Sequence, residues 1–135
     1  QLRIVAANRD IGDASTVSLE ATPHATSLRP LAPVHLAATR GVDGVTFTWI
    51  RRARFDGDSW EGEIPLCETS EEYNVDILSG ADVVRTLDVF SPGALYAAAD
   101  EIADFGAPQA ALTIRVTQLS ATVGRGFAAM ATLPP

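Results

Sequence analysis

The sequence predicts a mainly β domain, folded as a two-layered β-sandwich of about seven short strands with one short helix. The clearest sign is the strict alternation in Gly44–Arg52, which places three large apolar residues on one face of a strand and two threonines on the other. A similar alternation recurs in Glu72–Leu78 and in Leu112–Gln118. Turn-forming residues separate such segments every 8–12 residues, a spacing typical of sandwiches.

The first part of the chain is expected to stand apart from the sandwich. Leu2–Ala6 and Val17–Ala21 each have the pattern of a short strand, with turn-forming residues between them. Thr22–Pro30 contains two prolines and no periodicity, which indicates a linker. We therefore expect residues 1–30 to finish a preceding domain or to lie across the next one, and residues 31–135 to form the sandwich.

The expected strands follow one another from residue 34 to the end of the chain. Trp60–Leu66 is expected to be a short edge strand, because Pro65 has no amide hydrogen to donate. Gly124–Gly126 is expected to be the turn before the last strand. The expected strands are Val34–Thr39, Val45–Arg52, Trp60–Leu66, Glu72–Leu78, Val83–Phe90, Leu112–Gln118 and Phe127–Leu133.

The inward side chains of these strands define the expected core. In Glu72–Leu78, Asn74 and Asp76 alternate with the core residues and are expected to face outward. The expected core residues are Val45, Phe47, Trp49, Tyr73, Val75, Ile77, Ile114 and Val116.

One helix, over about residues 92–105, is expected to interrupt the strands. Ser91 is a suitable N-cap, Pro92 suits the first helical position, and Gly106 follows the last apolar residue as a stop signal. A buried stripe at helical spacing is expected from Leu95, Ala99, Ile102 and Phe105. The acidic residues Asp100, Glu101 and Asp104 are expected to face solvent.

The charge of the chain argues against nucleic-acid binding. The net charge is −7, and all ten basic residues are arginines. An acidic surface repels phosphate, and the only cluster of basic residues is Arg51, Arg52 and Arg54. We therefore expect no direct contact between this domain and nucleic acid.

Other site classes are also disfavoured by composition. Cys67 is the only cysteine, so no intrachain disulfide can form. His24 and His35 are the only histidines and lack a metal-ligand spacing, so we expect no metal and no cofactor. No apolar run approaches the roughly 20 residues that span a bilayer. The chain begins with Gln1 rather than Met, and we expect it to be a piece of a longer polypeptide.

Trp60 is the first candidate contact residue. Its ring could stack on a sugar while Asp56, Asp58 and Glu61 accept hydroxyl hydrogen bonds; the alternative is a tryptophan that covers a sheet edge beside a hairpin turn. Asp56 and Asp58 could also be considered for calcium, but the further acidic ligands of a calcium loop are missing, so a turn is favoured.

The arginine cluster is the second candidate. Arg51, Arg52 and Arg54 could bind an acidic partner or an anionic glycan. The alternative is a set of ion pairs with Asp56, Asp58 or the 68–72 glutamates, each worth at most about 1 kcal/mol when exposed. Those glutamates, Glu68, Glu71 and Glu72, are expected to form a solvated loop rather than a catalytic carboxylate pair. With no Gly-x-Ser-x-Gly elbow either, we expect no catalytic residues.

Four motifs resemble, in order, those of fibronectin type III domains. They are Pro33–Leu36, Val45–Trp49, Tyr73–Ile77, and Leu112–Val116 followed by Gly124. The resemblance implies a fibronectin type III-like sandwich. The tyrosine that the family carries near the end of the penultimate strand is missing, and the expected helix replaces a short loop.

A narrower resemblance covers nearly the whole chain. It is to the C-terminal region of the host specificity, or megatron, protein of gene transfer agents and siphophage tails, whose upstream part carries a TIM-barrel-like domain. The motifs are Asn8–Asp13, Leu31–Leu36, Phe47–Arg52, Gly57–Trp60, Glu72–Tyr73, Ser91–Tyr96, Ala103–Gly106, Val116–Ser120 and Gly124–Gly126.

This resemblance implies a virion component at the tail tip of a particle that delivers DNA into an α-proteobacterial cell. The implied role is a non-enzymatic baseplate module that packs around the central hub with other tail-tip subunits, as a homotrimer, and contributes to host attachment. The alternative is a carbohydrate- or receptor-binding module on the host side, using Trp60, Asp58 or the arginine cluster. A cell-wall hydrolase is a weaker third possibility.

Overall fold

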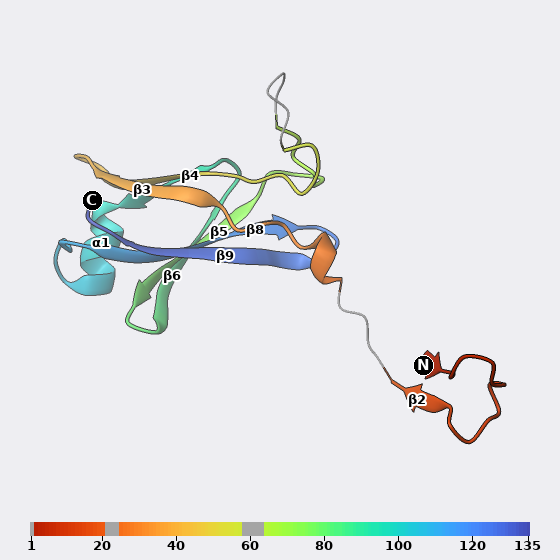
Figure 1. Ribbon diagram of the computed structural model, residues 1–135. Coiled ribbons are helices and arrows are strands. Elements are labelled where there is room, and N and C mark those ends of the chain that lie inside the picture. The colour runs from red at the N-terminus through yellow and green to blue at the C-terminus, as the bar shows by residue number, and fades with distance from the viewer. Residues whose placement is uncertain (1, 21–24, 58–63) are drawn as a thin grey trace.

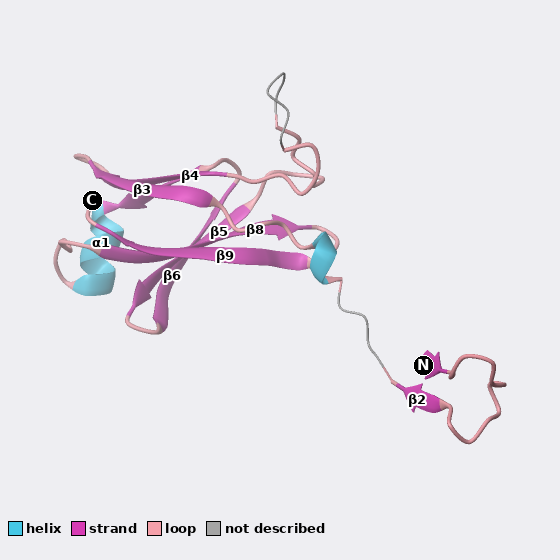
Figure 2. Ribbon diagram, in the orientation of Figure 1, coloured by secondary structure: helices cyan, strands magenta, loops and turns pink. Residues whose placement is uncertain are grey.

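Two antiparallel sheets, packed face to face, form the folded body of the protein (Figure 1). The computed structural model describes residues 2–20, 25–57 and 64–135. One sheet has the strand order β3–β4–β7 and the other the order β6–β5–β8–β9. The strands are β3 (Val34–Arg40), β4 (Gly44–Ile50), β5 (Tyr73–Ser79), β6 (Asp82–Val89), β7 (Gly93–Ala97), β8 (Leu112–Ser120) and β9 (Gly124–Leu133). The prediction of a mainly β sandwich is confirmed (Figure 2).

Side chains from both sheets meet in one core. All eight residues expected in the core are buried, and Ala94, Tyr96 and Leu112 join them. Trp49 of β4 and Tyr73 of β5 meet edge to face across the two sheets, with ring centroids 5.1 Å apart, an arrangement that aromatic pairs favour. Because one face of each strand is apolar, the same alternation that forms the strands also fixes their register.

The expected helix over 92–105 is wrong in its first half. Gly93–Ala97 is strand β7, which pairs with β4 along its whole length. Pairing with β4 satisfies the backbone of this segment and buries Ala94 and Tyr96, and these gains outweigh the local helix signals at Ser91 and Pro92. Tertiary pairing therefore decides the structure of this segment.

Helix α1 covers only Ala98–Phe105. Ala97 takes the N-cap position without a side-chain hydrogen bond, so Ser91 caps nothing here. Gly106 ends the helix with a φ of 78°, and its amide donates to the carbonyl oxygen of Ile102. A glycine suits this left-handed position because it has no Cβ.

The faces of α1 differ from the expected ones. Ile102 and Leu95 are each more than half exposed, and Ala99 is exposed too, so the expected apolar stripe is wrong except for Phe105, which packs against the core. Glu101 is instead 1% exposed. The helix therefore turns Glu101 toward the sandwich. Figure 1 shows α1 at one end of the two sheets.

Two further expectations concern the ends of strands. Residues 60–63 of the expected edge strand lie outside the described residues, and Ile64–Leu66 is not a strand. Gly124–Gly126 belongs to β9, and the turn before it lies at residues 121–123. The expected turn therefore lies too late in the sequence, because Gly124, with a φ of 73°, is the first residue of β9.

The N-terminal segment forms a small hairpin of its own. Strand β1 (Leu2–Ile4) pairs antiparallel with β2 (Val17–Leu19), and both are shorter than expected. A short 3₁₀ helix, η1, follows at Thr26–Leu28 within the expected linker.

The end of the linker is attached to β9. Arg29 donates from Nη2 to the carbonyl oxygen of Gly126 at 2.7 Å, and its guanidinium lies 4.7 Å from the centre of the Phe127 ring. The amide of Phe127 donates to the carbonyl oxygen of Pro30 at 2.8 Å. Gly126 permits this crossing, since a Cβ there would lie 2.7 Å from that oxygen.

Candidate functional site

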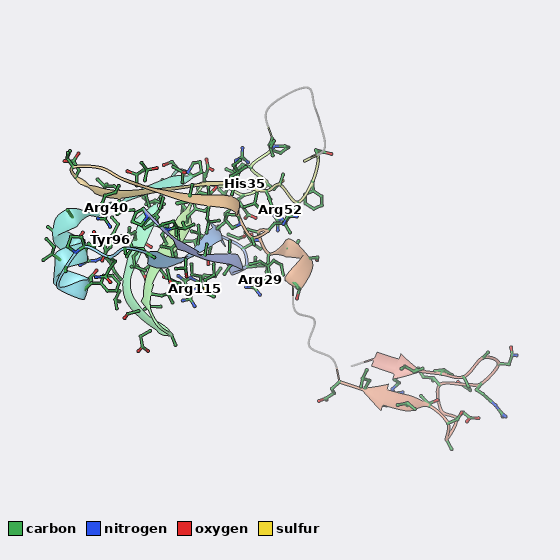
Figure 3. The ribbon with its side chains drawn as sticks, turned by 60° about the vertical axis from the view of Figure 1, so that its left-hand side comes forward. Arg29, His35, Arg40, Arg52, Tyr96 and Arg115 are labelled. Atoms are coloured by element: carbon green, nitrogen blue, oxygen red, sulfur yellow. The ribbon has the colours of Figure 1, made fainter. Side chains whose placement is uncertain are left out.

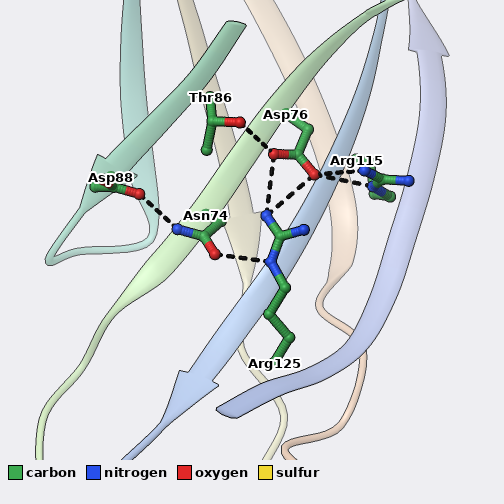
Figure 4. A network of polar contacts seen from close by, with 6 residues as sticks. All are labelled: Asn74, Asp76, Thr86, Asp88, Arg115 and Arg125. Carbon is green, nitrogen blue, oxygen red and sulfur yellow. Dashed lines mark hydrogen bonds and ion pairs between the residues drawn. The ribbon is translucent and has the colours of Figure 1, made fainter. Parts of the chain in front are cut away.

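A polar network covers the outer face of the four-stranded sheet, with Asp76 at its centre (Figure 4). Asp76 accepts a hydrogen bond from Thr86 Oγ1 at 2.7 Å, from Arg115 Nη2 at 2.7 Å and from Arg125 Nη2 at 3.0 Å. These four residues come one each from β5, β6, β8 and β9. The network therefore connects every strand of the sheet.

Asp76 was expected to face outward, and it does, yet it is only 1% exposed because the side chains around it cover it. Burial acts to raise the pKa of Asp76, but the hydrogen bonds from Thr86, Arg115 and Arg125 together hold that pKa below its usual value. The carboxylate is thus ionised and fully engaged, which suits bracing of the sheet rather than proton transfer.

The network extends to one side of Asp76. Asn74 accepts a hydrogen bond from Arg125 Nε at 2.8 Å and donates from Nδ2 to Asp88 at 2.5 Å. The two carboxylates and two guanidiniums balance in formal charge. Both arginines remain between a third and a half exposed, so this is a hydrated surface network.

A second cluster joins α1 to the three-stranded sheet. Arg40 of β3 donates to both carboxylate oxygens of Glu101, at 2.7 and 3.0 Å. The backbone amide of Gln109 donates to the same carboxylate at 2.8 Å. The hydrogen bond from Arg40, opposed by burial, lowers the pKa of Glu101. A bidentate pair of this kind fixes orientation as well as distance.

Helix α1 also contacts the four-stranded sheet through an ion pair. Arg85 of β6 donates to Asp104 from Nε at 2.7 Å and from Nη2 at 3.0 Å, and Tyr96 Oη donates to Asp104 at 2.7 Å. The hydrogen bond from Arg85, followed by that from Tyr96, lowers the pKa of Asp104. Figure 3 shows Arg40 and Tyr96 together at this end of the sandwich. We call the contacts of Glu101 and Asp104 the helix clasp.

The sequence did contain a signal for the helix clasp. Asp100, Glu101 and Asp104 recur at the spacing that puts residues on one side of a helix. Because carboxylates are rarely buried, the sequence predicts that this side faces solvent. The arginines that pair with them stand far away in the sequence, and only the folded topology brings them near.

Two arginines of the candidate cluster contact the segment between β4 and β5. Arg51 donates from Nη1 to the carbonyl oxygen of Pro65 at 2.8 Å and lies 3.6 Å from a carboxylate oxygen of Glu71. Arg54 donates to the carbonyl oxygen of Cys67 at 2.9 Å, and its Nη2 lies 2.8 Å from Glu68. The ion-pair alternative therefore describes these two arginines, whereas Arg52 is exposed near the other end of the sandwich from α1 (Figure 3).

The glutamate segment is less solvated than expected. The side chain of Glu68 is 6% exposed and that of Arg54 12%. Glu68 Oε1 is close to Arg54 but is not in hydrogen-bond geometry with any described residue. This pair lines an open depression of about 300 Å³, together with Cys67, Thr69, Ser120 and Thr122. The expectation of a solvated loop is thus wrong for Glu68, because Arg54 folds over it.

Several candidate residues of the sequence analysis lie away from the polar networks or outside the described residues. Four of them lie outside the described residues, namely Trp60, Asp58, Glu61 and His24. The first three belong to the possible sugar-binding site. His35 is exposed at a bulge in β3, with a φ of 54°. Within residues 2–20, 25–57 and 64–135, no three histidine, cysteine or acidic side chains gather as metal ligands.

The sequence matches no protein-family model and no curated protein. Among the described residues, no helix is long and apolar enough to cross a membrane.

Proposed function

We propose that this chain is a non-enzymatic structural module of a phage-like tail-tip baseplate, of the kind found in gene transfer agents. In this role it packs around the central hub with other tail-tip subunits, as part of a homotrimer, at the tip of a virion-like particle that attaches to a host and delivers DNA. The motif resemblance to the megatron proteins suggests the setting.

The observation that supports the proposal is that the buried carboxylates pair with arginines of neighbouring strands. Glu101 and Asp104 tie α1 to both sheets, and Asp76 ties the four strands of one sheet together. Paired and hydrogen-bonded carboxylates of this kind give orientation and rigidity. A module that must hold its neighbours in place during DNA delivery needs that rigidity.

The strand order supports the finer assignment to a fibronectin type III-like domain. The first, second and fifth strands of the sandwich form one sheet, and the fourth, third, sixth and seventh form the other. In constant-type immunoglobulin domains the fourth strand joins the first, second and fifth instead. Here β6 pairs with β5, as the fibronectin type III resemblance implies.

An epitope tag tests the proposal in the assembled particle. Val42 is 98% exposed in the turn between β3 and β4, so a tag inserted there in the full-length protein is accessible. Immunogold electron microscopy of purified particles is expected to place the label at the tail tip, with a capsid-tagged strain as control. Absence of the tag from particles, despite normal amounts in cells, would refute the proposal.

A further inference from the structure

The Arg54–Glu68 pair holds buried polar atoms that lack a hydrogen-bond partner. Four such side-chain atoms occur within the described residues, and three of them belong to this pair. They are Arg54 Nε, Arg54 Nη1 and Glu68 Oε1, and the fourth is Trp49 Nε1. Buried polar atoms in folded proteins almost always have a partner, which is often a water molecule or a ligand. The pair is therefore a place where further hydrogen bonds can form.

The pair lines the open depression of about 300 Å³ at this end of the sandwich. The depression lies between the segment that joins β4 to β5, the turn that joins β8 to β9, and Leu28 of η1. Three further lining residues carry hydroxyl groups, namely Thr69, Ser120 and Thr122. Its volume is at the lower end of the range for small-molecule sites, so it suits a small ligand.

The charges of the pair favour a neutral ligand. An anion would meet the carboxylate of Glu68 and a cation the guanidinium of Arg54, in a partly buried place where loss of water is costly. A guanidinium only donates hydrogen bonds and a carboxylate only accepts them, whereas a hydroxyl group does both. Two adjacent hydroxyl groups can therefore accept from Arg54 and donate to Glu68.

We propose that the depression binds a neutral saccharide whose adjacent hydroxyl groups bridge Arg54 and Glu68. Ser120 Oγ accepts a hydrogen bond from the amide of Thr122 at 3.2 Å, which leaves the hydroxyl hydrogen of Ser120 free to donate to another sugar oxygen. Because the unpaired atoms are themselves buried, binding requires the Arg54 guanidinium to turn toward the sugar. This inference does not depend on the proposed function.

A peptide backbone fits the pair less well. Its amide also offers one donor and one acceptor, but in the trans peptide bond the N–H and C=O groups point in opposite directions. One amide therefore cannot bridge two side chains that lie next to each other. Adjacent hydroxyl groups of a sugar ring can point to the same side.

An NMR titration of the isotope-labelled chain tests the proposal. The probes are four neutral sugars: glucose, galactose, mannose and N-acetylglucosamine. At least one is expected to bind with a Kd of millimolar order and to shift the amide signals of residues 54, 67–69 and 120–122 in a saturable way. No saturable shift with any of them up to about 100 mM would overturn the proposal. Saturable shifts confined to other residues would overturn this site.

Valine substitutions test the hydroxyl groups of the depression. Thr69 and Thr122 are both exposed, and the double variant Thr69→Val with Thr122→Val keeps their shape while it removes both hydroxyl groups. It should weaken sugar binding by about fivefold or more, as expected for the loss of hydrogen bonds. The matched control is Thr46→Val with Thr48→Val, at two exposed positions of β4, and it should bind like the parent. Unchanged affinity of the first variant would contradict the site.

Glu68→Gln supplies a readout that a purely structural role of Glu68 would not produce. The parent chain should bind the uronic acid of the same sugar more weakly than the neutral form, because Glu68 repels its carboxylate. In Glu68→Gln, Arg54 keeps its charge without an anionic neighbour, so the uronic acid should gain affinity relative to the neutral sugar. An unchanged preference in a variant that unfolds cooperatively in urea would overturn the role of the pair. A variant that does not fold leaves the valine pair to decide, and neither result affects the proposed function.

Discussion

Replacement of Asp76 by asparagine removes one of the two most buried carboxylates among the described residues. The change keeps the size of the side chain but leaves Arg115 and Arg125 as neighbouring positive charges with no carboxylate between them. Breaking a buried ion pair costs about 3–5 kcal/mol, but these arginines keep 35% and 46% of their side-chain surface exposed and can return to water, which reduces the expected loss to about 2–3 kcal/mol.

Urea denaturation at pH 7 measures this loss as a lower transition midpoint with an unchanged slope. In a thermal melt, the same loss corresponds to a fall of roughly 5–10 °C for a domain of this size. Asp88→Asn is the control, because within the described part of the chain the Asp88 carboxylate takes part in a side-chain hydrogen bond with Asn74 alone, at the exposed edge of the network. It is expected to cost at most about 1 kcal/mol.

The pH dependence of the Asp76→Asn deficit gives a second test. Burial acts to raise the pKa of Asp76, and the hydrogen bonds from its three neighbours more than offset it, so the native pKa is lowered. A lowered native pKa stabilises the fold fully above the unfolded value of about 3.9 and loses that contribution as pH falls through the native value. The deficit should therefore be constant from pH 7 to about pH 4 and shrink at lower pH. No deficit at pH 7, or one that is the same at pH 2, would refute the reasoning.

Three other substitutions test separate parts of the fold. Trp49→Ala should destabilise the protein by about 3–5 kcal/mol in urea, as expected for a large core aromatic, and a variant that melts like the parent would contradict the core. Gly126→Ala forces a methyl group toward Pro30 and should cost about 1–3 kcal/mol; unchanged stability would show that the linker does not cross there. Glu101→Gln removes the ionic contact with Arg40, and hydrogen exchange should show faster exchange of the α1 amides with the strands unaffected. Unchanged protection of α1 would argue against the helix clasp.

The core of this fold could be predicted from the sequence because its strands are locally encoded. In β4, every second residue is large and apolar, and Phe47 and Trp49 are buried where the alternation put them. The same is true of Tyr73, Val75 and Ile77 in β5. A period-two pattern can be recognised in one strand without knowing its partner, so it predicts the buried face from the sequence alone.

The segment from Ser91 to Gly106 shows where local signals fail. Its C-terminal stop at Gly106 is correct, but the apparent cap at Ser91 belongs to a turn before β7. A short edge strand with small residues carries a weak pattern of its own, and its conformation depends on the position of β4. Such non-local pairing is invisible in a window of neighbouring residues.

The charged clusters were missed for a related reason. Asp76 alternates with core residues, which correctly put it on the outer face, but its burial depends on arginines 39 and 49 residues further along the chain. Glu101 likewise depends on Arg40, 61 residues before it. Charge composition shows that opposite charges are available to pair, but only the topology of the two sheets shows which of them do.

A cryo-electron microscopy map of the intact tail tip, detailed enough to trace strands, tests the central claim most directly. We predict density for this two-sheet sandwich at the tip, with α1 held against both sheets by Glu101 and Asp104. Density at the tip that this chain does not fit would contradict the proposed function.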